Sequence, residues 1–278
     1  MHGDRETAGT AGSSASRGVD SADGRRIAPL ALPRVHGIDR ARRLRRQWDG
    51  DDIDLEAAID VWVDRRLRLR PDARLFVRPG RGPRPASVLV LLDLSASAND
   101  IGAGGQALLD IEKRAALLLA ASNAGGIDRL AIDGFSSNTR AEVRYYRLLD
   151  FGRPLDEGIR ATIEAMRGRY STRLGAALRH AIRRLADEPV GQRAVLVVTD
   201  GAPSDIDVHD PRYLIEDARQ AVMQARDAGV RVACLAVDGA AEVSLKRIFG
   251  WRHYGIVDDP RSLPARLASM SRRLAAAR

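Results

Sequence analysis

The chain has no hydrophobic run that approaches the ~18 residues of a membrane-spanning helix, and its first residues lack the apolar stretch of a secretory signal. It has one cysteine among its 278 residues, Cys234, so no disulfide can form within the chain. Cys234 lies in the apolar run 232–237, where we expect it to be a small core residue. These absences favour a cytoplasmic protein without a transmembrane segment.

Aromatic residues and lysine are also scarce. Aromatic residues make up 4% of the chain, so we expect a core built mostly of Ala, Leu and Val. Lysine occurs only at Lys113 and Lys246, so arginine supplies nearly all of the basic charge behind the formal net charge of +8. No basic strand with interspersed aromatic residues and no recognition-helix pattern is present, so we expect no nucleic-acid partner.

The first part of the chain differs in composition from the rest. Residues 1–28 are rich in Gly, Ser, Ala and charge without periodicity, which predicts a disordered segment. Residues 29–85 are predicted to be a helical arm and linker, because Leu55, Ile59 and Val63 recur at helical spacing and Pro and Gly cluster between 79 and 85. Residues 86–278 are predicted to form the main domain.

Apolar runs alternate with helical patterns throughout this domain. The predicted strands are 88–92, 127–134, 194–199, 230–237 and 253–257, with an edge strand at 142–148 paired as a hairpin. The predicted helices are 106–123, 155–166, 174–186, 211–228, 241–249 and 263–277. This alternation is typical of an α/β fold: a Rossmann-like, doubly wound, mostly parallel sheet with helices on both faces.

Oxygen-bearing side chains follow several of these strands and crossovers. Asp93, Ser95 and Ser97 come directly after the apolar run 87–92, Asp200 follows 195–198, and Thr172 lies just before a predicted helix. Parallel strands end at one edge of a sheet, so we expect these side chains to converge at a solvated rim. Hydroxyl and carboxylate oxygens are the ligands that Mg²⁺ prefers, which predicts a site for Mg²⁺ or another divalent cation.

These residues resemble the metal-ion-dependent adhesion site of the von Willebrand factor A (VWA) domain. That family's signature is Asp-x-Ser-x-Ser, a distant Thr, and a later Asp in a Thr-Asp-Gly turn, and all occur here in order. The resemblance implies that Ser95, Ser97 and Thr172 coordinate Mg²⁺ directly or through water. It also implies that Asp93 and Asp200 orient these groups, and that a partner's Asp or Glu takes the open position.

Longer segments resemble the carboxy-terminal part of the NorD/CbbO proteins. These segments are 170–181, 199–207, 212–217, 248–250 and 263–264. The resemblance implies an adaptor, not an enzyme, that works with a MoxR-class AAA+ ATPase on a client enzyme presenting an acidic residue to the metal. We expect nitric oxide reductase as the client (NorD type). The alternatives are Rubisco activation (CbbO type) and a stand-alone interaction module without an ATPase.

The same residues also allow other interpretations. Asp-x-Ser-x-Ser by itself also fits a helix cap, and Asp205 and Asp207 could serve the site but fit turn formation after Pro203 better. Ser95 or Ser97 would need His180 or His253 as a base for hydrolysis, and neither serine lies in a G-x-S-x-G motif. The glycines of 102–107 lie too far from the strand end for a dinucleotide site. Arginines between 43 and 70 and two tryptophans, at 48 and 62, offer either a solvated, packed surface or a contact for an acidic partner.

Overall fold

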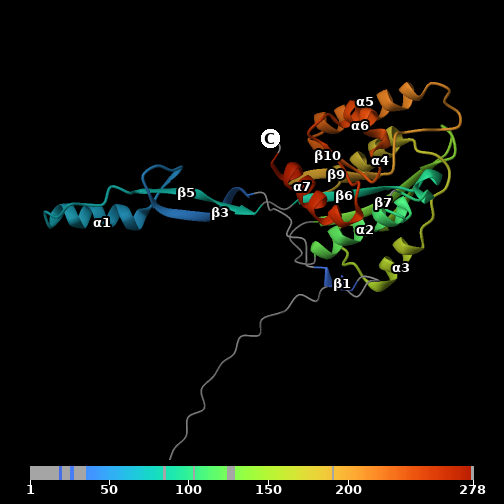
Figure 1. Ribbon diagram of the computed structural model, residues 1–278. Helices are drawn as coiled ribbons and strands as arrows, with labels where there is room; N and C mark the ends of the chain where they lie inside the picture. Colours follow the sequence, from blue (N-terminus) through green and yellow to red (C-terminus); the bar gives the residue numbers. More distant parts are fainter. Residues whose placement is uncertain are drawn as a thin grey trace, which may run out of the picture.

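A six-stranded sheet forms the centre of the larger part of the chain (Figure 1). The computed structural model describes residues 19–20, 26–27, 36–83, 86–102, 104–123, 129–189 and 191–276. The predicted disordered segment 1–28 lies largely outside the described residues; within it, β1 (Val19–Asp20) and β2 (Arg26–Ile27) pair antiparallel.

The sheet has the strand order β11-β10-β9-β6-β7-β8. Its strands are β6 (Ala86–Asp93), β7 (Arg129–Ser137), β8 (Val143–Leu149), β9 (Gln192–Thr199), β10 (Val230–Ala236) and β11 (Tyr254–Ile256). All neighbours are parallel except β8, which pairs antiparallel with β7 as an edge strand. The predicted mostly parallel α/β fold and its edge hairpin are confirmed.

Helices cover both faces of this sheet (Figure 1). They are α2 (Leu108–Ser122), α3 (Glu157–Ala165) and α7 (Leu263–Ala276) on one face, and α4 (Leu174–Ala186), α5 (Pro211–Asp227) and α6 (Glu242–Phe249) on the other. Side chains alternate along a strand, so β6 buries Leu89 and Leu91 in one core layer and Val90 and Leu92 in the other. Cys234 is fully buried in the same layer as Leu89 and Leu91.

The strand order places a switch point between β6 and β9. The chain leaves β6 for β7 on one side and later returns to β9 on the other side, so the loops after β6 and β9 diverge at the carboxyl edge. The register pairs Leu92 with Val198, which brings Asp93 next to Thr199. Such switch points are where open α/β sheets bind ligands.

The arm before this domain differs from the helical arm that the sequence predicts. Its helix is α1 (Leu55–Arg66), but β3 (His36–Gln47) and β5 (Phe76–Pro83) form a long antiparallel hairpin, with β4 (Asp52–Ile53) beside β5. The prolines at 79 and 83 therefore lie within a strand. They are tolerated there because β4 pairs only with Phe76 and Val77, so the rest of that edge of β5 makes no β4 hydrogen bonds.

Among the described residues, no helix is both long and apolar enough to cross a bilayer.

Candidate metal centre

Asp93, the last residue of β6, is the innermost group of the predicted site. Its side chain is fully buried and accepts three hydrogen bonds. The Ser95 backbone N–H and the Thr172 hydroxyl donate to Oδ1 at 3.1 and 3.2 Å, and the Thr199 hydroxyl donates to Oδ2 at 2.8 Å. Thr199 was not among the predicted site residues, although it precedes Asp200 in the Thr-Asp-Gly turn.

The two serines lie at the start of a 3₁₀ turn, Ala96–Asn99. The hydroxyl oxygens of Ser95 and Ser97 are 3.0 Å apart, and the Ser97 hydroxyl also hydrogen-bonds the Asp200 carboxylate. Ser95 is buried and Ser97 is exposed. Hydrogen bonds therefore link all five predicted residues in one network at this edge of the sheet, and Ser97 faces solvent.

The loop that carries Thr172 is held against the loop that carries the serines. The Asn99 side chain donates to the Gly168 carbonyl at 2.9 Å and accepts from the Gly168 N–H at 3.1 Å. A Cβ on Gly168 would collide with the Ser95 carbonyl oxygen, so glycine allows this approach. Tyr170, at φ 65°, lies in the left-handed region that bulky residues rarely adopt, and its carbonyl accepts from the Ala96 N–H at 2.8 Å.

Two pairs of backbone hydrogen bonds then fix Thr172 between the ends of β7 and β9, the strands on either side of β6. Ser171 exchanges both of its backbone hydrogen bonds with Ser137, at the end of β7, each at 2.8 Å. Thr172 exchanges its own with Ser204, in the loop after β9, at 2.8 and 3.1 Å. The chain therefore has little freedom to move the Thr172 hydroxyl away from Asp93.

A buried ion pair supports the same loop from behind. Arg173 donates to Asp205 at 2.9 Å, and Asp205 also accepts from the Ser137 hydroxyl at 2.6 Å. Arg173 pairs with Asp207 as well, and Asp207 accepts from the Arg140 backbone N–H at 2.7 Å. The two aspartates thus fasten the loop, a larger role than the turn predicted for them. The sequence signal was an arginine directly after the key threonine.

Asp93 and Asp200 carry charge that the described residues do not neutralise. Neither carboxylate forms an ion pair with a lysine or arginine among the described residues. Burial, together with the charge of Asp200, raises the pKa of Asp93 to about 7. Burial also raises the pKa of Asp200, against the opposing effect of its hydrogen bond from Ser97. Two buried carboxylates and three hydroxyls without a cation are a donor set that fits a hard divalent metal.

A third buried carboxyl group lies near this pair and was missed from the sequence. Glu112 of α2 is fully buried, and neither of its side-chain oxygens has a hydrogen-bond partner. Burial, followed by the charges of Asp93 and Asp200, raises its pKa well above the usual range. Its position on the apolar face of α2, between Leu109 and Ala116, was a signal in the sequence.

The structure corrects one expectation about exposure. The site was expected at a solvated rim, but Asp93 and Thr172 are 0% and 3% exposed, and only Ser97 among the five faces solvent. The loops around Gly168 and Ser204 cover the site. Replacing these residues therefore changes a buried polar network as well as a metal site.

The hydrolase interpretation receives no support from the histidines. The His180 ring lies 4.2 Å from the Tyr145 ring, and neither serine hydrogen-bonds a histidine among the described residues. The part of the chain that the structure describes also holds no group of three or more His, Cys, Asp or Glu side chains able to bind a metal. A metal at this edge would therefore depend on the serine and threonine hydroxyls.

Comparison with known proteins agrees with this architecture. The profile of the von Willebrand factor type A domain matches residues 88–266, and the chain belongs to this family. Among solved structures, the PilB minor pilin from Streptococcus sanguinis superposes with a TM-score of 0.55 at 18% identity, covering 70% of this chain and 62% of the pilin. The von Willebrand domain of the Mfa5 pilus tip protein from Porphyromonas gingivalis gives 0.53 at 13%, covering 68% and 94%. These likenesses concern the fold alone.

The chain is also similar to larger proteins named NorD. Protein NorD of Brucella suis is 34% identical over 232 residues, which is 84% of this chain and 36% of the relative. Protein NorD of Stutzerimonas stutzeri is 33% identical over 239 residues, 84% of this chain and 39% of the relative. An uncharacterized protein of Pseudomonas aeruginosa is 36% identical over 236 residues, 85% and 39%. The chain thus spans well under half the length of these relatives. A match of 236 residues exceeds the stretch from 88 to 278, so it includes part of the arm.

Proposed function

We propose that this protein is a Mg²⁺-dependent adaptor whose VWA domain binds a carboxylate of a partner protein. The observation that carries the proposal is the pair of buried carboxylates, Asp93 and Asp200, that pair with no lysine or arginine among the described residues and share hydrogen bonds with three hydroxyls. Ser95, Ser97 and Thr172 would hold the ion. The carboxylates would orient the hydroxyls and the coordinated water, and they would neutralise the charge of the metal ion.

Because Ser97 is exposed, we expect a partner to reach the site from the side of Ser97. A metal held from below by buried oxygens has its open coordination position toward solvent, where a partner's Asp or Glu can enter. The serine hydroxyls contact each other and the Asp200 carboxylate, and neither serine hydrogen-bonds a histidine among the described residues, an arrangement that we interpret as binding and not turnover.

The wider role is proposed from the relatives. Similarity to proteins named NorD supports a role in activating nitric oxide reductase together with a MoxR-class AAA+ ATPase, in preference to Rubisco activation. In that role the metal would recruit the client through its acidic residue while the ATPase supplies the mechanical work.

Titration calorimetry with Mg²⁺ tests the site. We expect the wild type to bind one ion and Ser97→Ala to bind at least about tenfold more weakly. Ser204→Ala is the matched control, because only the backbone of Ser204 contacts Thr172, and it should bind like the wild type. Equal affinity in all three proteins would contradict the proposal.

Reductase activity tests the wider role. The chain is co-expressed with nitric oxide reductase and a MoxR-class ATPase, and reductase turnover is measured with wild type, Ser97→Ala and Ser204→Ala. Loss of activation with Ser97→Ala alone supports the adaptor. Mg²⁺ binding without any effect on the reductase would favour a stand-alone interaction module.

A further inference from the structure

Helix α1 of the arm directs its large apolar side chains away from the strands beside it. Its inward face carries small residues: Ala57 is 3% exposed, and Ala58 and Val61 are half-buried. Leu55 and Trp62 on the opposite face are 73% and 58% exposed. This is the reverse of an ordinary amphipathic surface helix, which buries its largest apolar residues.

The outward residues form one continuous stripe. Leu55, Ile59 and Trp62 follow at helical spacing, and Leu67 and Leu69 extend the apolar surface past the end of the helix at 63% and 57% exposure. Exposed apolar surface of this extent marks an association site in most soluble proteins.

The arm buries few apolar side chains of its own, so little buried apolar surface offsets the exposed stripe. Among its described side chains, from 39 to 82, only Ala57 and Val77 are buried hydrophobic residues. A two-layer unit this small is only marginally stable without further apolar burial. Figure 1 shows it as an extension beside the domain, which leaves the stripe uncovered.

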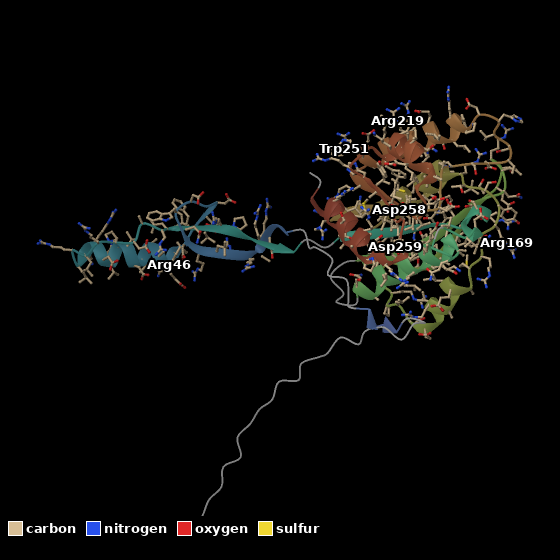
Figure 2. All side chains as sticks on the ribbon, viewed as in Figure 1. Arg46, Arg169, Arg219, Trp251, Asp258 and Asp259 are labelled. Atoms are coloured by element: carbon tan, nitrogen blue, oxygen red, sulfur yellow. The ribbon has the colours of Figure 1, made fainter. Side chains whose placement is uncertain are left out.

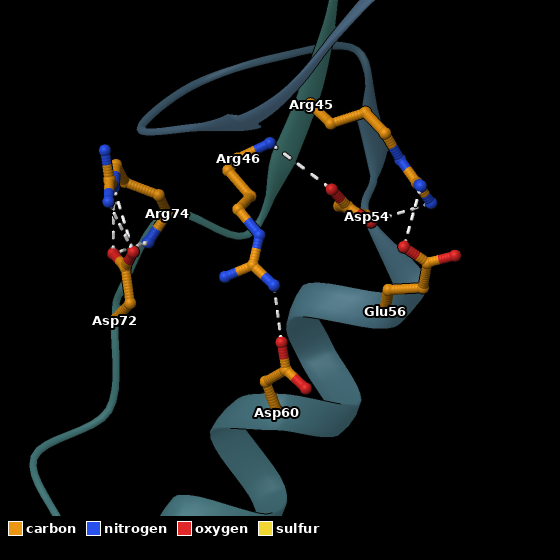
Figure 3. Close-up of polar contacts among 7 residues, drawn as sticks. All are labelled: Arg45, Arg46, Asp54, Glu56, Asp60, Asp72 and Arg74. Atoms are coloured by element: carbon orange, nitrogen blue, oxygen red, sulfur yellow. Dashed lines mark hydrogen bonds and ion pairs between the residues drawn. The ribbon is translucent and has the colours of Figure 1, made fainter. Parts of the chain in front are cut away.

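Ion pairs fix the beginning of the helix to the hairpin. Arg45 donates to Glu56 at 2.7 Å and lies 3.1 Å from Asp54, and Arg46 pairs with Asp60 at 2.5 Å (Figure 3). These contacts hold the stripe in one orientation. They involve acidic residues at the beginning and in the first half of α1, and none of them involves the arginines at its far end.

The two ends of the helix carry charge of opposite sign. At the far end, no ion pair involves Arg65, Arg66, Arg68 or Arg70 among the described residues; Arg66 lies over the Trp62 ring at 4.6 Å. At the near end, Asp51 has no ion pair among these residues, and Asp49 is 86% exposed and 3.9 Å from Arg78.

We propose that the α1 face associates with the α1 face of a second copy of this chain, with the two helices antiparallel. A two-fold axis places the same stripe on both sides of the contact. It also brings Asp49 and Asp51 of each copy to Arg68 and Arg70 of the other, so charge complements charge at both ends. A uniformly acidic partner would meet Asp49 and Asp51 at one end and be repelled, which is why we favour self-association.

Sedimentation velocity on the purified full chain, over a wide range of concentration, tests this inference. We expect a concentration-dependent shift from monomer to dimer, and Trp62→Glu should weaken it at least about tenfold. Trp251→Glu is the matched control, because Trp251 is 69% exposed and lies on the domain, away from the arm (Figure 2). Monomer at every concentration, or a dimer unaffected by Trp62→Glu, would overturn the proposal.

A charge exchange tests the antiparallel arrangement. One variant carries Arg68→Asp and Arg70→Asp, and a second carries Asp49→Arg and Asp51→Arg. Each variant alone should dimerise less than the wild type, because like charges face each other at both ends. An equimolar mixture should form heterodimers, because opposite charges then face each other at both ends of the contact. A mixture that associates no better than either variant alone would refute this arrangement.

Discussion

Replacing Asp93 by asparagine should stabilise the metal-free protein and abolish its response to Mg²⁺. The buried carboxylate has hydrogen bonds but no ion pair among the described residues, and its pKa rises from 3.8 to about 7 in the folded state. Asparagine has nearly the same shape and carries no charge. It keeps an acceptor for Ser95 and Thr172 and removes the charge that burial disfavours.

The magnitude and its pH dependence follow from the pKa. A folded-state pKa above the unfolded value means that the native state binds the extra proton between pH 4 and 7. Wild-type stability in chelator should therefore fall as the pH rises through this range and level off above it. The rise in the pKa of Asp93 from 3.8 to about 7 corresponds to a loss of roughly 4 kcal/mol in the free energy of unfolding at high pH. Asparagine accepts weaker hydrogen bonds than a carboxylate, so we expect a net gain of about 1–3 kcal/mol for Asp93→Asn at pH 8.

Thermal unfolding with chelator and with excess Mg²⁺ measures both effects. In chelator at pH 8, Asp93→Asn should melt above the wild type, by roughly 2–4 °C per kcal/mol for a domain of this size. Mg²⁺ at a hundred times its dissociation constant should stabilise the wild type by about 2.7 kcal/mol and so raise its melting temperature. The melting temperature of Asp93→Asn should not change.

A second buried aspartate provides the control. Asp133 is also fully buried, but it pairs with Arg184 and accepts from the Tyr145 hydroxyl at 2.7 Å. Asp133→Asn should keep the full response to Mg²⁺. The reasoning fails if Asp93→Asn is less stable than the wild type in chelator at pH 8, or if Mg²⁺ stabilises it as much as the wild type.

Three further substitutions test the packing around the site. Gly168→Ala should lower Mg²⁺ affinity at least about tenfold by calorimetry, because its Cβ meets the Ser95 carbonyl oxygen, whereas Gly201→Ala, whose Cβ meets nothing within 4 Å, should bind normally. Arg173→Met should lower the free energy of unfolding, measured in urea, by about 3 kcal/mol, because it leaves the carboxylate of Asp205 buried without its ion-pair partner. A loss below 1 kcal/mol, as expected for an exposed pair such as Arg144 with Glu142, would contradict this role. Gly175→Ala should cost about 1–3 kcal/mol by the same assay, since its Cβ collides with Asp217 between α4 and α5, and a neutral result would mean that these helices separate freely.

Much of the domain was predictable because its signals are local. The central strands β6, β9 and β10 are apolar runs of the length expected for strands buried on both faces, and the helices repeat their apolar residues at helical spacing. The direction of the strands then follows from the alternation of strand and helix. That is why residues as distant in sequence as Asp93 and Thr172 could be assigned to one edge, and the structure places their side chains 3.2 Å apart.

The arm was predicted less well because its pairing is not local. The hairpin joins His36 to Pro83 across a helix and two loops, and no two-residue turn marks it in the sequence. The spacing of Leu55 and Ile59 correctly indicates a helix but cannot tell which side is covered. The short side chains of Ala57 and Ala58 face the strands instead.

Within the VWA domain, the sequence by itself determined the order of strands and helices and the chemical type of each group at the sheet edge, since both depend on residue type and spacing. Only the tertiary structure decided the charge environment: that Asp93 is buried without an ion pair among the described residues, that Glu112 lies nearby, and that Arg173 and Asp205 support the loop of Thr172. The physical reason is that burial and electrostatic interaction depend on which distant segments pack together, and this packing is a property of the whole fold.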